Sequence, residues 1–176
     1  MFKELNDLRI FFEKPNERFH LRQIARFLKR SPATIKKHLK RFVKIGILNV
    51  KKERGMEFYY SNVENSYYKE WKRIYNRFKI IESGLFDFLK KEFNLPVIIL
   101  FGSYERGEDD ENSDVDIFIL TETKKRIDLS RYEKKLNRPI QLLVMNKKEF
   151  QKAKKENLEL INSIINGSVL FGFLEI

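Results

Sequence analysis

The sequence of 176 residues contains no cysteine and only two histidines. The absence of cysteine excludes a disulfide framework, a zinc–thiolate site and a cysteine nucleophile, and it suits a reducing cytoplasm. Long apolar runs are also missing, because the longest covers residues 97–101 and is far too short to cross a bilayer. Residues 1–6 lack the basic start and long apolar core of a signal peptide. We therefore expect a soluble, cytoplasmic protein.

Acidic residues are scarce in the first third of the chain. Residues 1–62 hold 16 Lys and Arg against 6 Asp and Glu, whereas residues 63–176 hold 20 against 19. Nearly all of the net charge of +11 therefore lies in the first segment. A basic segment joined to a balanced one predicts an anionic partner for the first segment alone. The alternative is a lysine-rich surface without such a partner, and charge by itself does not decide between the two.

Apolar spacing in the first segment predicts three helices followed by two short strands. Ser31 and Pro32 supply an N-cap and a first-turn proline for the third helix, and Gly46 stops it. The expected elements are helices near residues 5–12, 21–30 and 32–46 and strands at residues 47–50 and 57–60, joined by a turn at residues 51–55.

This order of helices and a two-stranded wing is typical of a winged helix-turn-helix. The segment LRQIARFLKRSPATIKKHLKRFVKIGIL, residues 21–48, resembles winged-helix transcription regulators over its whole length. The resemblance implies that the third helix lies in the major groove of double-stranded DNA and that the wing contacts an adjacent groove or the backbone. The expected DNA-binding residues are Thr34, Lys36, Lys37, His38, Lys40 and Arg41 on the helix and Lys51, Lys52 and Arg54 on the wing.

Two alternatives stay open for this segment. Some winged helices bind proteins, although the basic outer face of the third helix argues for DNA. His38 is also a candidate metal ligand, but the only other histidine is His20 and no cysteine is present. A surface or phosphate-contacting histidine is therefore the stronger interpretation of His38.

The rest of the chain begins with a long helical pattern that Pro96 ends. Its apolar stripe is either core or, in part, the seam of a homodimer, since helix-turn-helix proteins often bind paired half-sites. The expected elements are this helix at residues 67–93, strands at residues 97–101, 115–121 and 140–145, and a helical segment at residues 147–166. The predicted domains are a winged helix-turn-helix at residues 1–64, a linking helix at residues 65–94 and a third part at residues 95–176.

One stretch of the third part, VIILFGSYERGEDDENSDVDIFIL, concentrates the residues that suggest chemistry. Gly102 lets a backbone approach a phosphate closely, and Ser103 can donate a hydrogen bond to it. Asp114 and Asp116 open a predicted strand two residues apart, so their side chains face the same side. Paired carboxylates suit Mg²⁺, which also takes phosphate oxygens as ligands. A solvated acidic loop is the alternative, but it does not account for the Gly-Ser with correctly spaced aspartates.

This stretch resembles the minimal nucleotidyltransferases of the DNA polymerase β-like superfamily, over about residues 95–173. The shared pattern is a Gly-Ser, a loop with a further glycine, and Ser-Asp-x-Asp on a strand, here Gly102, Ser103, Arg106, Gly107, Ser113, Asp114 and Asp116. The resemblance implies Mg²⁺, with ATP or another nucleotide as ligand or substrate. It also implies catalytic and metal-binding roles for Asp114 and Asp116, and nucleotide binding by Gly102, Ser103, Arg106 and Ser113.

One position departs from that family. Active members carry a third carboxylate on a later strand, and the matching position in RPIQLLVM is Gln141, which we expect as the third metal ligand. An amide can coordinate a metal but cannot act as a base, and two metals need more negative charge than two carboxylates supply. Nucleotide binding can then survive while transfer is slow or lost. The alternatives are an edge-strand Gln141 that faces water, or another acid, Glu122 or Asp128, that completes the site.

These observations predict an α/β (α+β) protein with a winged helix-turn-helix, a long linking helix and a nucleotidyltransferase-like mixed sheet with helices. We expect a DNA-binding transcriptional regulator whose second domain binds Mg-nucleotide, with weak or lost catalysis. The alternative is an active nucleotidyltransferase that moves AMP from ATP. The family resembled also includes antitoxins of HEPN-type toxin–antitoxin pairs. The expected partners are double-stranded DNA, a nucleotide, and either a small helical toxin or a second copy of the chain, with no membrane.

Overall fold

The computed structural model describes residues 3–175, so Met1, where the segment inspected for a signal peptide begins, lies outside it. Helices and two separate sheets make up the described chain, which confirms the predicted mixed α+β class. Contacts divide the chain into two compact units, residues 1–75 and residues 76–176, within the segment predicted to link the domains. No helix in residues 3–175 is long and apolar enough to span a membrane.

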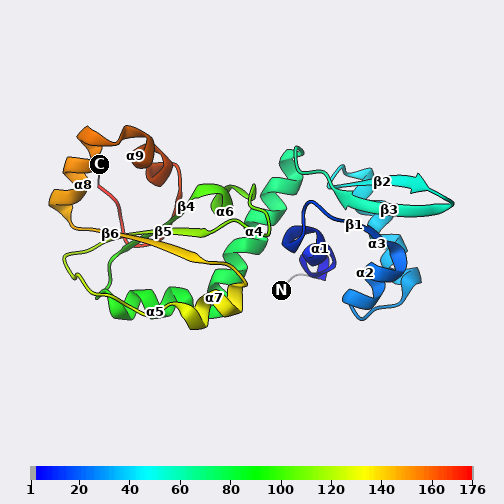
Figure 1. Ribbon diagram of the computed structural model, residues 1–176, viewed down its shortest axis with the longest axis horizontal. Helices are drawn as coiled ribbons and strands as arrows, with labels where there is room; N and C mark the ends of the chain where they lie inside the picture. The colour runs from blue at the N-terminus through cyan, green and yellow to red at the C-terminus, as the bar shows by residue number, and fades with distance from the viewer. Residues whose placement is uncertain (1–2, 176) are drawn as a thin grey trace. The chain divides into compact units, whose positions relative to one another are not determined.

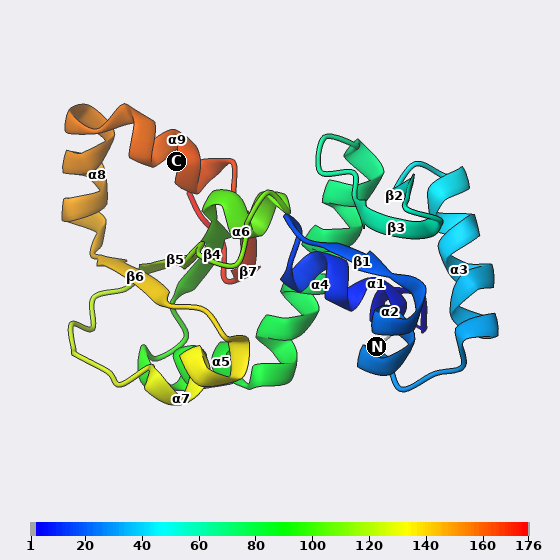
Figure 2. The ribbon, with the colours of Figure 1, turned by 45° about the vertical axis from the view of Figure 1, so that its right-hand side comes forward.

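The first unit packs helices against a three-stranded antiparallel sheet with the strand order β1-β3-β2 (Figures 1 and 2). The sequence does not predict β1, because three residues are too few to show alternation. Phe19 of this strand lies opposite Tyr59 and is buried with it. The elements are α1 (Lys3–Glu13), β1 (Arg18–His20), α2 (Leu21–Phe27), α3 (Pro32–Lys44), β2 (Leu48–Glu53) and β3 (Met56–Ser61).

The start and orientation of α3 follow from its own residues. Ser31 is the N-cap, and its Oγ accepts a hydrogen bond from the Thr34 N–H at 3.2 Å. Pro32 occupies the first turn, where no backbone donor is needed. Helical spacing places one apolar stripe against the core, so the basic residues between its members face solvent. The buried members are Ile35, Leu39 and Phe42.

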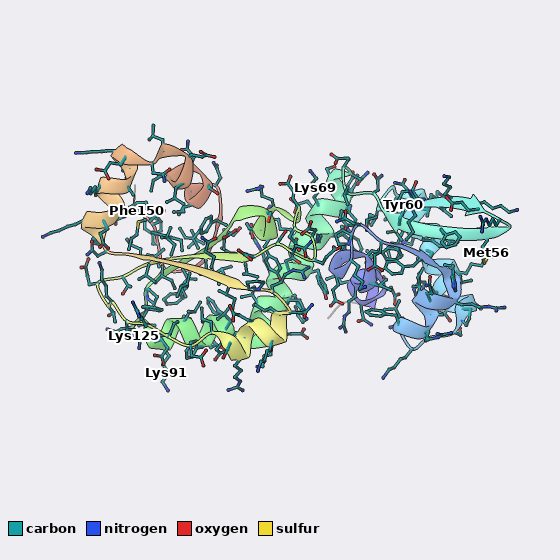
Figure 3. The ribbon with its side chains drawn as sticks, in the orientation of Figure 1. Met56, Tyr60, Lys69, Lys91, Lys125 and Phe150 are labelled. Atoms are coloured by element: carbon teal, nitrogen blue, oxygen red, sulfur yellow. The ribbon has the colours of Figure 1, made fainter. Side chains whose placement is uncertain are left out.

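The two strands after α3 are longer than the sequence predicts. β2 extends to Glu53 and β3 begins at Met56, so the turn is reduced to Arg54 and Gly55. Figure 3 shows Met56 near the tip of this ribbon and Tyr60 closer to the core. The basic residues of the predicted turn therefore lie mostly on paired strands, in an extended two-stranded ribbon.

The single helix predicted for residues 67–93 is wrong, because the structure has α4 (Ser66–Ser83) and α5 (Leu85–Glu92). Gly84 separates them with a φ of 79°, a left-handed conformation that is costly for a residue with a Cβ. Ser83 supports the break, since its Oγ donates to the Ile80 carbonyl at 2.7 Å and accepts from the Leu85 N–H at 3.1 Å. Helical periodicity continues across this break and conceals it.

The second unit is built on a four-stranded mixed sheet with the order β6-β5-β4-β7. β5 pairs parallel with β6, whereas β4 is antiparallel to both β5 and β7. Its remaining elements are β4 (Val97–Phe101), α6 (Gly102–Arg106), β5 (Val115–Leu120), α7 (Ser130–Leu136), β6 (Ile140–Met145), α8 (Lys147–Glu156), α9 (Leu158–Ile165) and β7 (Ser168–Phe171).

Helices cover both faces of this sheet, as Figure 1 shows. Alternate residues of β5 enter different cores: Val115, Ile117 and Ile119 pack with residues of α5 and α7. Phe118 faces the other way and packs with Phe150 of α8 and with α9. Because both faces of the sheet are covered, the sequences of β4 and β5 are almost entirely apolar. Asp116, on the same face as Phe118, is the polar exception and lies at the end of the strand.

Three features of this unit differ from the sequence-based expectation. The helical segment at residues 147–166 is two helices, since Asn157 ends α8 and caps α9 by accepting from the Leu160 N–H at 3.1 Å. Local sequence patterns predict neither the helix α7 nor the strand β7. Both are short, and β7 is stabilised by its pairing with β4, a long-range contact that local periodicity does not report.

Candidate functional site

The end of β4 brings a backbone turn against a carboxylate. Phe101 is extended with a φ of −142°, and Gly102 then turns the chain into α6 with a φ of 75°. A Cβ at Gly102 would lie 2.1 Å from Asp116 Oδ2, closer than any side chain can approach. Phe101 and Asp116 are strand partners, which explains this proximity. The structure therefore brings together the Gly-Ser turn and the second aspartate of the motif.

Asp116 lies in a partly buried position beside other charges. Burial raises the pKa of Asp116, the negative charge of Asp114 raises it further, and Arg106 acts in the opposite direction. Asp114 itself is exposed and lies directly before β5. The site thus has two neighbouring carboxylates with incompletely compensated negative charge.

Gln141 is the strand partner of Asp116. β5 and β6 run in parallel with these two residues in register, so their side chains lie on the same face of the sheet. The pairing expected between these two strands is therefore observed. Gln141 is exposed and lies on β6, the edge strand of the sheet. Within residues 3–175, no group of three or more His, Asp or Glu side chains is placed to hold a metal ion.

Neither alternative acid is placed to replace the missing carboxylate. Glu122 follows the far end of β5, and at about 3.3 Å per residue it lies roughly 15–20 Å along the strand from Asp116. Asp128 is fully exposed before α7, where it accepts a hydrogen bond from the Ser130 N–H at 2.9 Å. A hydrogen bond from the Ser130 side chain, together with this backbone contact, lowers the pKa of Asp128.

Two of the predicted nucleotide-binding side chains have partners within the protein. Ser113 Oγ donates to Asp110 Oδ1 at 3.0 Å and accepts from the Asp110 N–H at 2.9 Å, which closes the acidic loop. Arg106 Nε donates to Glu108 Oε2 at 2.8 Å between two exposed side chains. The Ser113 contacts organise the loop before Asp114, whereas the exposed Arg106 pair is weak enough to exchange for another anion.

The sequence analysis misses the residues that anchor this loop. Asp109 is 3% exposed, and its Oδ1 accepts a hydrogen bond from Asn76 Nδ2 at 2.7 Å. The same amide donates to the Tyr104 carbonyl at 2.8 Å. Nη2 of Arg138 lies 3.8 Å from Oδ2 of Asp109, and Nη1 of Arg138 donates to the Glu111 carbonyl at 3.1 Å. Nothing in the run Glu-Asp-Asp-Glu distinguishes the buried Asp109 from its solvated neighbours.

Comparison with known families matches residues 82–164 to the family described as "Nucleotidyltransferase domain". Residues 82–164 are therefore similar to nucleotidyltransferase domains. The match includes the Gly-Ser turn, both aspartates and Gln141. No curated protein and no solved structure matches the chain.

Nucleotidyltransferase domains generally use Mg²⁺ and nucleotides, and the donors present here fit one such ion. The carboxylates of Asp114 and Asp116 and the amide oxygen of Gln141 are all hard oxygen ligands, as Mg²⁺ prefers. A cation would also offset the like-charge contact that raises the pKa of Asp116. Two carboxylates do not supply enough negative charge to hold a pair of divalent ions firmly.

An ion pair between the buried Glu105 and the partly exposed Arg77 holds α6 in the second unit. Glu105 is 1% exposed, and Arg77 of α4 reaches it with two hydrogen bonds, Nη2 to Oε1 at 2.7 Å and Nε to Oε2 at 3.2 Å. Ser168 of β7 contacts both side chains. This pair holds the helix that follows the Gly-Ser turn, because Glu105 comes two residues after Ser103.

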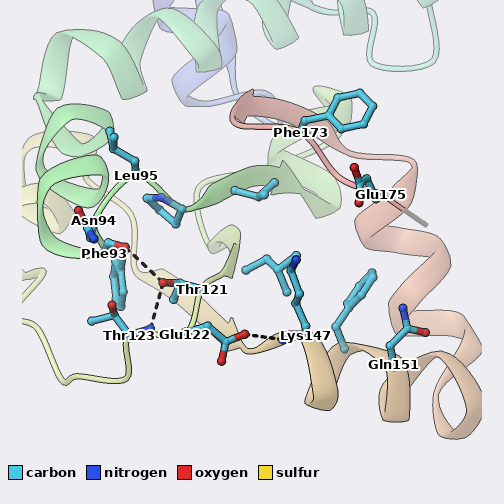
Figure 4. A pocket seen from close by; sticks show the side chains of 14 residues that line it. Phe93, Asn94, Leu95, Thr121, Glu122, Thr123, Lys147, Gln151, Phe173 and Glu175 are labelled. Carbon is cyan, nitrogen blue, oxygen red and sulfur yellow. Dashed lines mark hydrogen bonds between the residues drawn. The ribbon is translucent and has the colours of Figure 1, made fainter.

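A pocket of about 750 Å³ lies at the opposite end of the sheet (Figure 4). It is lined by the start of β4 and the end of β5, whereas the two aspartates lie at the start of β5. Leu95 and Phe173 at its rim are 68% and 78% exposed. Of the acids considered for the metal site, only Glu122 lines it. The pocket is therefore separate from the predicted nucleotide site.

The basic residues predicted to bind DNA are mostly exposed in the first unit, and they differ in their partners. Nη1 of Arg41 lies 3.8 Å from Oε1 of Glu4, and Nζ of Lys51 lies 3.0 Å from Oε1 of Glu53. His38 is half-buried against Asp7, so its position differs from that of the exposed lysines. Thr34 hydrogen-bonds to Ser31 at the helix start. Five of the basic residues predicted to bind DNA are exposed and form no ion pair within residues 3–175: Lys36, Lys37, Lys40, Lys52 and Arg54.

Proposed function

We propose that the chain is a DNA-binding transcriptional regulator whose nucleotidyltransferase domain binds Mg-nucleotide with weak or lost catalysis. The proposal of weak or lost catalysis depends on one observation, the register that pairs Gln141 with Asp116. It supports Gln141 as the occupant of the position where active members of the family hold their third carboxylate.

Nucleotide binding follows from groups that meet at one end of the sheet. Asp114, Asp116 and the Gln141 amide oxygen would hold the ion, which supplies positive charge to the phosphate oxygens of the nucleotide. Gly102 permits close approach of the backbone to a phosphate, and the Ser103 hydroxyl can donate to it. Arg106 is available as a further cation because its pair with Glu108 is exposed.

Weak catalysis follows from what Gln141 cannot do. In transfer of AMP, a hydroxyl oxygen of the acceptor forms a bond to the α-phosphorus of ATP, and the bond from that phosphorus to the bridging oxygen of pyrophosphate breaks. The hydroxyl proton must go to a base, and a neutral amide does not accept it. With Gln141 in place of a carboxylate, the site loses both a base and a negative charge for a second metal.

DNA binding is supported by the element order α1-β1-α2-α3-β2-β3, which suits a winged helix-turn-helix, and by the charge of α3. Lys36, Lys37 and Lys40 project from the solvent side of α3 without internal ion pairs. A helix of this kind fits the major groove, and unpaired lysines gain most from phosphate contact because no existing pair is broken. Lys52 and Arg54 would add contacts from the β2–β3 ribbon.

An active nucleotidyltransferase, including one that acts as the antitoxin of a HEPN-type pair, is the second candidate. The observation that favours it is the intact pair of Asp114 and Asp116, with Asp116 directly against the Gly-Ser turn.

Nucleotide binding and transfer by the full chain separate these candidates. Calorimetric titration with Mg-ATP should detect binding to the wild type and no binding to Asp116→Asn. Incubation with Mg²⁺ and ATP labelled at the α-phosphate should leave little label on the protein or on added hydroxyl acceptors.

Gln141→Asp should raise that label transfer and tighten the second metal. Gln151→Asp is the matched control, because it adds the same charge at the distant pocket. Robust transfer by the wild type would favour the active enzyme. Absence of nucleotide binding would contradict both candidates.

A further inference from the structure

Asp7 in α1 is a buried charge that contacts His38 of the proposed DNA-binding helix α3 and the neighbouring Arg30. Only 2% of its side chain is exposed, and its Oδ2 lies 2.5 Å from Nδ1 of His38 on α3. Its Oδ1 lies 3.1 Å from Nη1 of Arg30, just before α3. The Arg30 contact is an ion pair without hydrogen-bond geometry, because Oδ1 has no hydrogen-bond partner among residues 3–175.

These contacts decide which atom of His38 carries a hydrogen. An ionised carboxylate only accepts hydrogen bonds, so Nδ1 of His38 is the donor in its short contact with Asp7. Arg30 supplies the positive charge that a buried carboxylate requires, so the imidazole ring does not have to be charged. A neutral ring with its hydrogen on Nδ1 has a lone pair on Nε2. Nε2 is then a hydrogen-bond acceptor for any partner outside the protein.

An acceptor on α3 has few possible partners on DNA. Phosphate oxygens are themselves acceptors, so a neutral Nε2 gains no hydrogen bond from the backbone. In the major groove, the donors are the exocyclic amino groups of adenine (N6) and cytosine (N4). His38 lies four residues after Thr34 and three before Arg41, on one face of α3, and 27% of its side chain is exposed.

We propose that His38 reads a base and that Asp7 is its positioning residue, so that Nε2 of His38 accepts a hydrogen bond from the amino group of an adenine or a cytosine. This inference rests on the proposed DNA binding and adds specificity to it. Lys36, Lys37 and Lys40 contact phosphates whatever the sequence, whereas His38 discriminates between bases. A carboxylate that orients a histidine in this way also fixes its tautomer.

The test starts from duplexes that the full chain selects from a library of random sequences. In a selected duplex, each adenine and each cytosine in turn is replaced by an analogue that lacks the exocyclic amino group. The wild type should lose about tenfold in affinity at one base of each half-site, the usual cost of a lost base contact. His38→Ala should bind all these duplexes more weakly and lose the sensitivity at that base.

Asp7→Asn should relax the same sensitivity, because an amide can either accept from Nδ1 or donate to it and so no longer sets the tautomer. If Asp7→Asn does not fold, His38→Gln still tests the base contact itself, since His38 is partly exposed and its replacement leaves Asp7 paired with Arg30. Glu4→Gln is the matched control: it removes an α1 carboxylate that lies 3.8 Å from Arg41, and the analogue profile should not change.

The outcomes are distinguishable. If no duplex is enriched, the proposed DNA binding is wrong and the inference fails with it. If duplexes bind but no amino group matters, or if His38→Ala keeps the wild-type profile, DNA binding stands and the role of His38 is wrong. If the base-analogue profile changes in His38→Ala but not in a folded Asp7→Asn variant, the positioning role of Asp7 is wrong.

Discussion

In the first unit, Lys36, Lys37 and Lys40 extend from α3 without an ion pair among the described residues. In the second unit, two carboxylates near the Gly-Ser turn are buried and held within the protein: Glu105 pairs with Arg77, and Asp109 accepts a hydrogen bond from Asn76. Free surface charges cost the fold little and keep their interaction energy for a ligand. Buried pairs contribute little net stability, but they hold a backbone in one place and are costly to break.

The comparison therefore separates two kinds of charged residue. Loss of a lysine of α3 should weaken DNA binding and leave the fold intact. Loss of a buried partner in the second unit should destabilise that unit and leave DNA binding intact. Asp7 departs from this pattern within the first unit, because it is buried and paired like the residues of the second.

The largest effect is expected from Arg77→Met, which leaves the carboxylate of Glu105 buried without its cation. We expect the free energy of unfolding to fall by about 3 kcal/mol, the usual cost of breaking a buried pair. Urea unfolding of the full chain measures the loss, and hydrogen exchange should place it in β4 and α6. Arg73→Met on the same helix breaks an exposed pair with Glu70 and should cost less than about 1 kcal/mol. Equal losses in both variants would contradict the role of the buried pair.

Replacing Lys36, Lys37 and Lys40 together with alanine tests the other side of the comparison. In a plot of the logarithm of the DNA association constant against the logarithm of the salt concentration, the slope should become shallower by about three. The affinity near physiological salt should fall roughly a hundredfold. The free energy of unfolding should stay unchanged, because alanine favours the helix and the substitutions remove no ion pair. A matched triple variant at Lys148, Lys152 and Lys155, exposed on α8, removes the same charge elsewhere. If that control weakens binding equally, net charge rather than α3 is responsible.

Gly102→Ala should disturb the nucleotide site directly. The left-handed φ of 75° alone costs about 1–2 kcal/mol for a residue with a Cβ. The new methyl group would also displace Asp116, because the Cβ position lies 2.1 Å from its Oδ2. We expect nucleotide binding to be lost in calorimetry while DNA binding persists. Gly55→Ala is a useful control, since that glycine has a similar φ of 80° and open space around it. Retained nucleotide affinity in Gly102→Ala would place the site elsewhere.

The smallest effect is expected from Asp116→Asn, and its sign is opposite to that of the other changes. Because the pKa of Asp116 is raised in the folded state, its charged form destabilises the fold. The favourable contribution of the neutral acid is complete below the ordinary Asp pKa of about 3.9 and is lost as pH rises through the raised value. Asp116→Asn should therefore melt at a slightly higher temperature than wild type at neutral pH, without Mg²⁺.

The advantage of Asp116→Asn should shrink as the pH is lowered toward the ordinary Asp pKa. Asp114→Asn should give a smaller gain, because it relieves only the like-charge contribution and leaves the burial of Asp116 unchanged. Mg²⁺ should raise the melting temperature of the wild type and not that of Asp116→Asn. A wild type that is the more stable protein at neutral pH without the ion would contradict the raised pKa.

Much of the architecture follows from the sequence by local rules. The cap at Ser31 and Pro32 sets the start of α3, and apolar runs mark β4 and β5 where the structure has them. The spacing from Gly102 to Asp116 predicts that the Gly-Ser turn and a carboxylate meet, because antiparallel strands bring the end of one beside the start of the next. The charge difference between the two segments needs no structure at all. These features depend on residues close in the chain or on one strand pairing.

Other features depend on contacts that no local pattern contains. β1 and β7 are strands because β3 and β4 pair with them. Asp7 and His38 are 31 residues apart, and each alone resembles an ordinary surface residue. Asp109 and Glu105 are buried because Asn76 and Arg77 reach them from α4. Gln141 could be matched to the third carboxylate by family resemblance, but only the parallel register of β5 and β6 places it beside Asp116. Periodicity reports which face of an element is buried, whereas the partner on that face is determined by the tertiary packing.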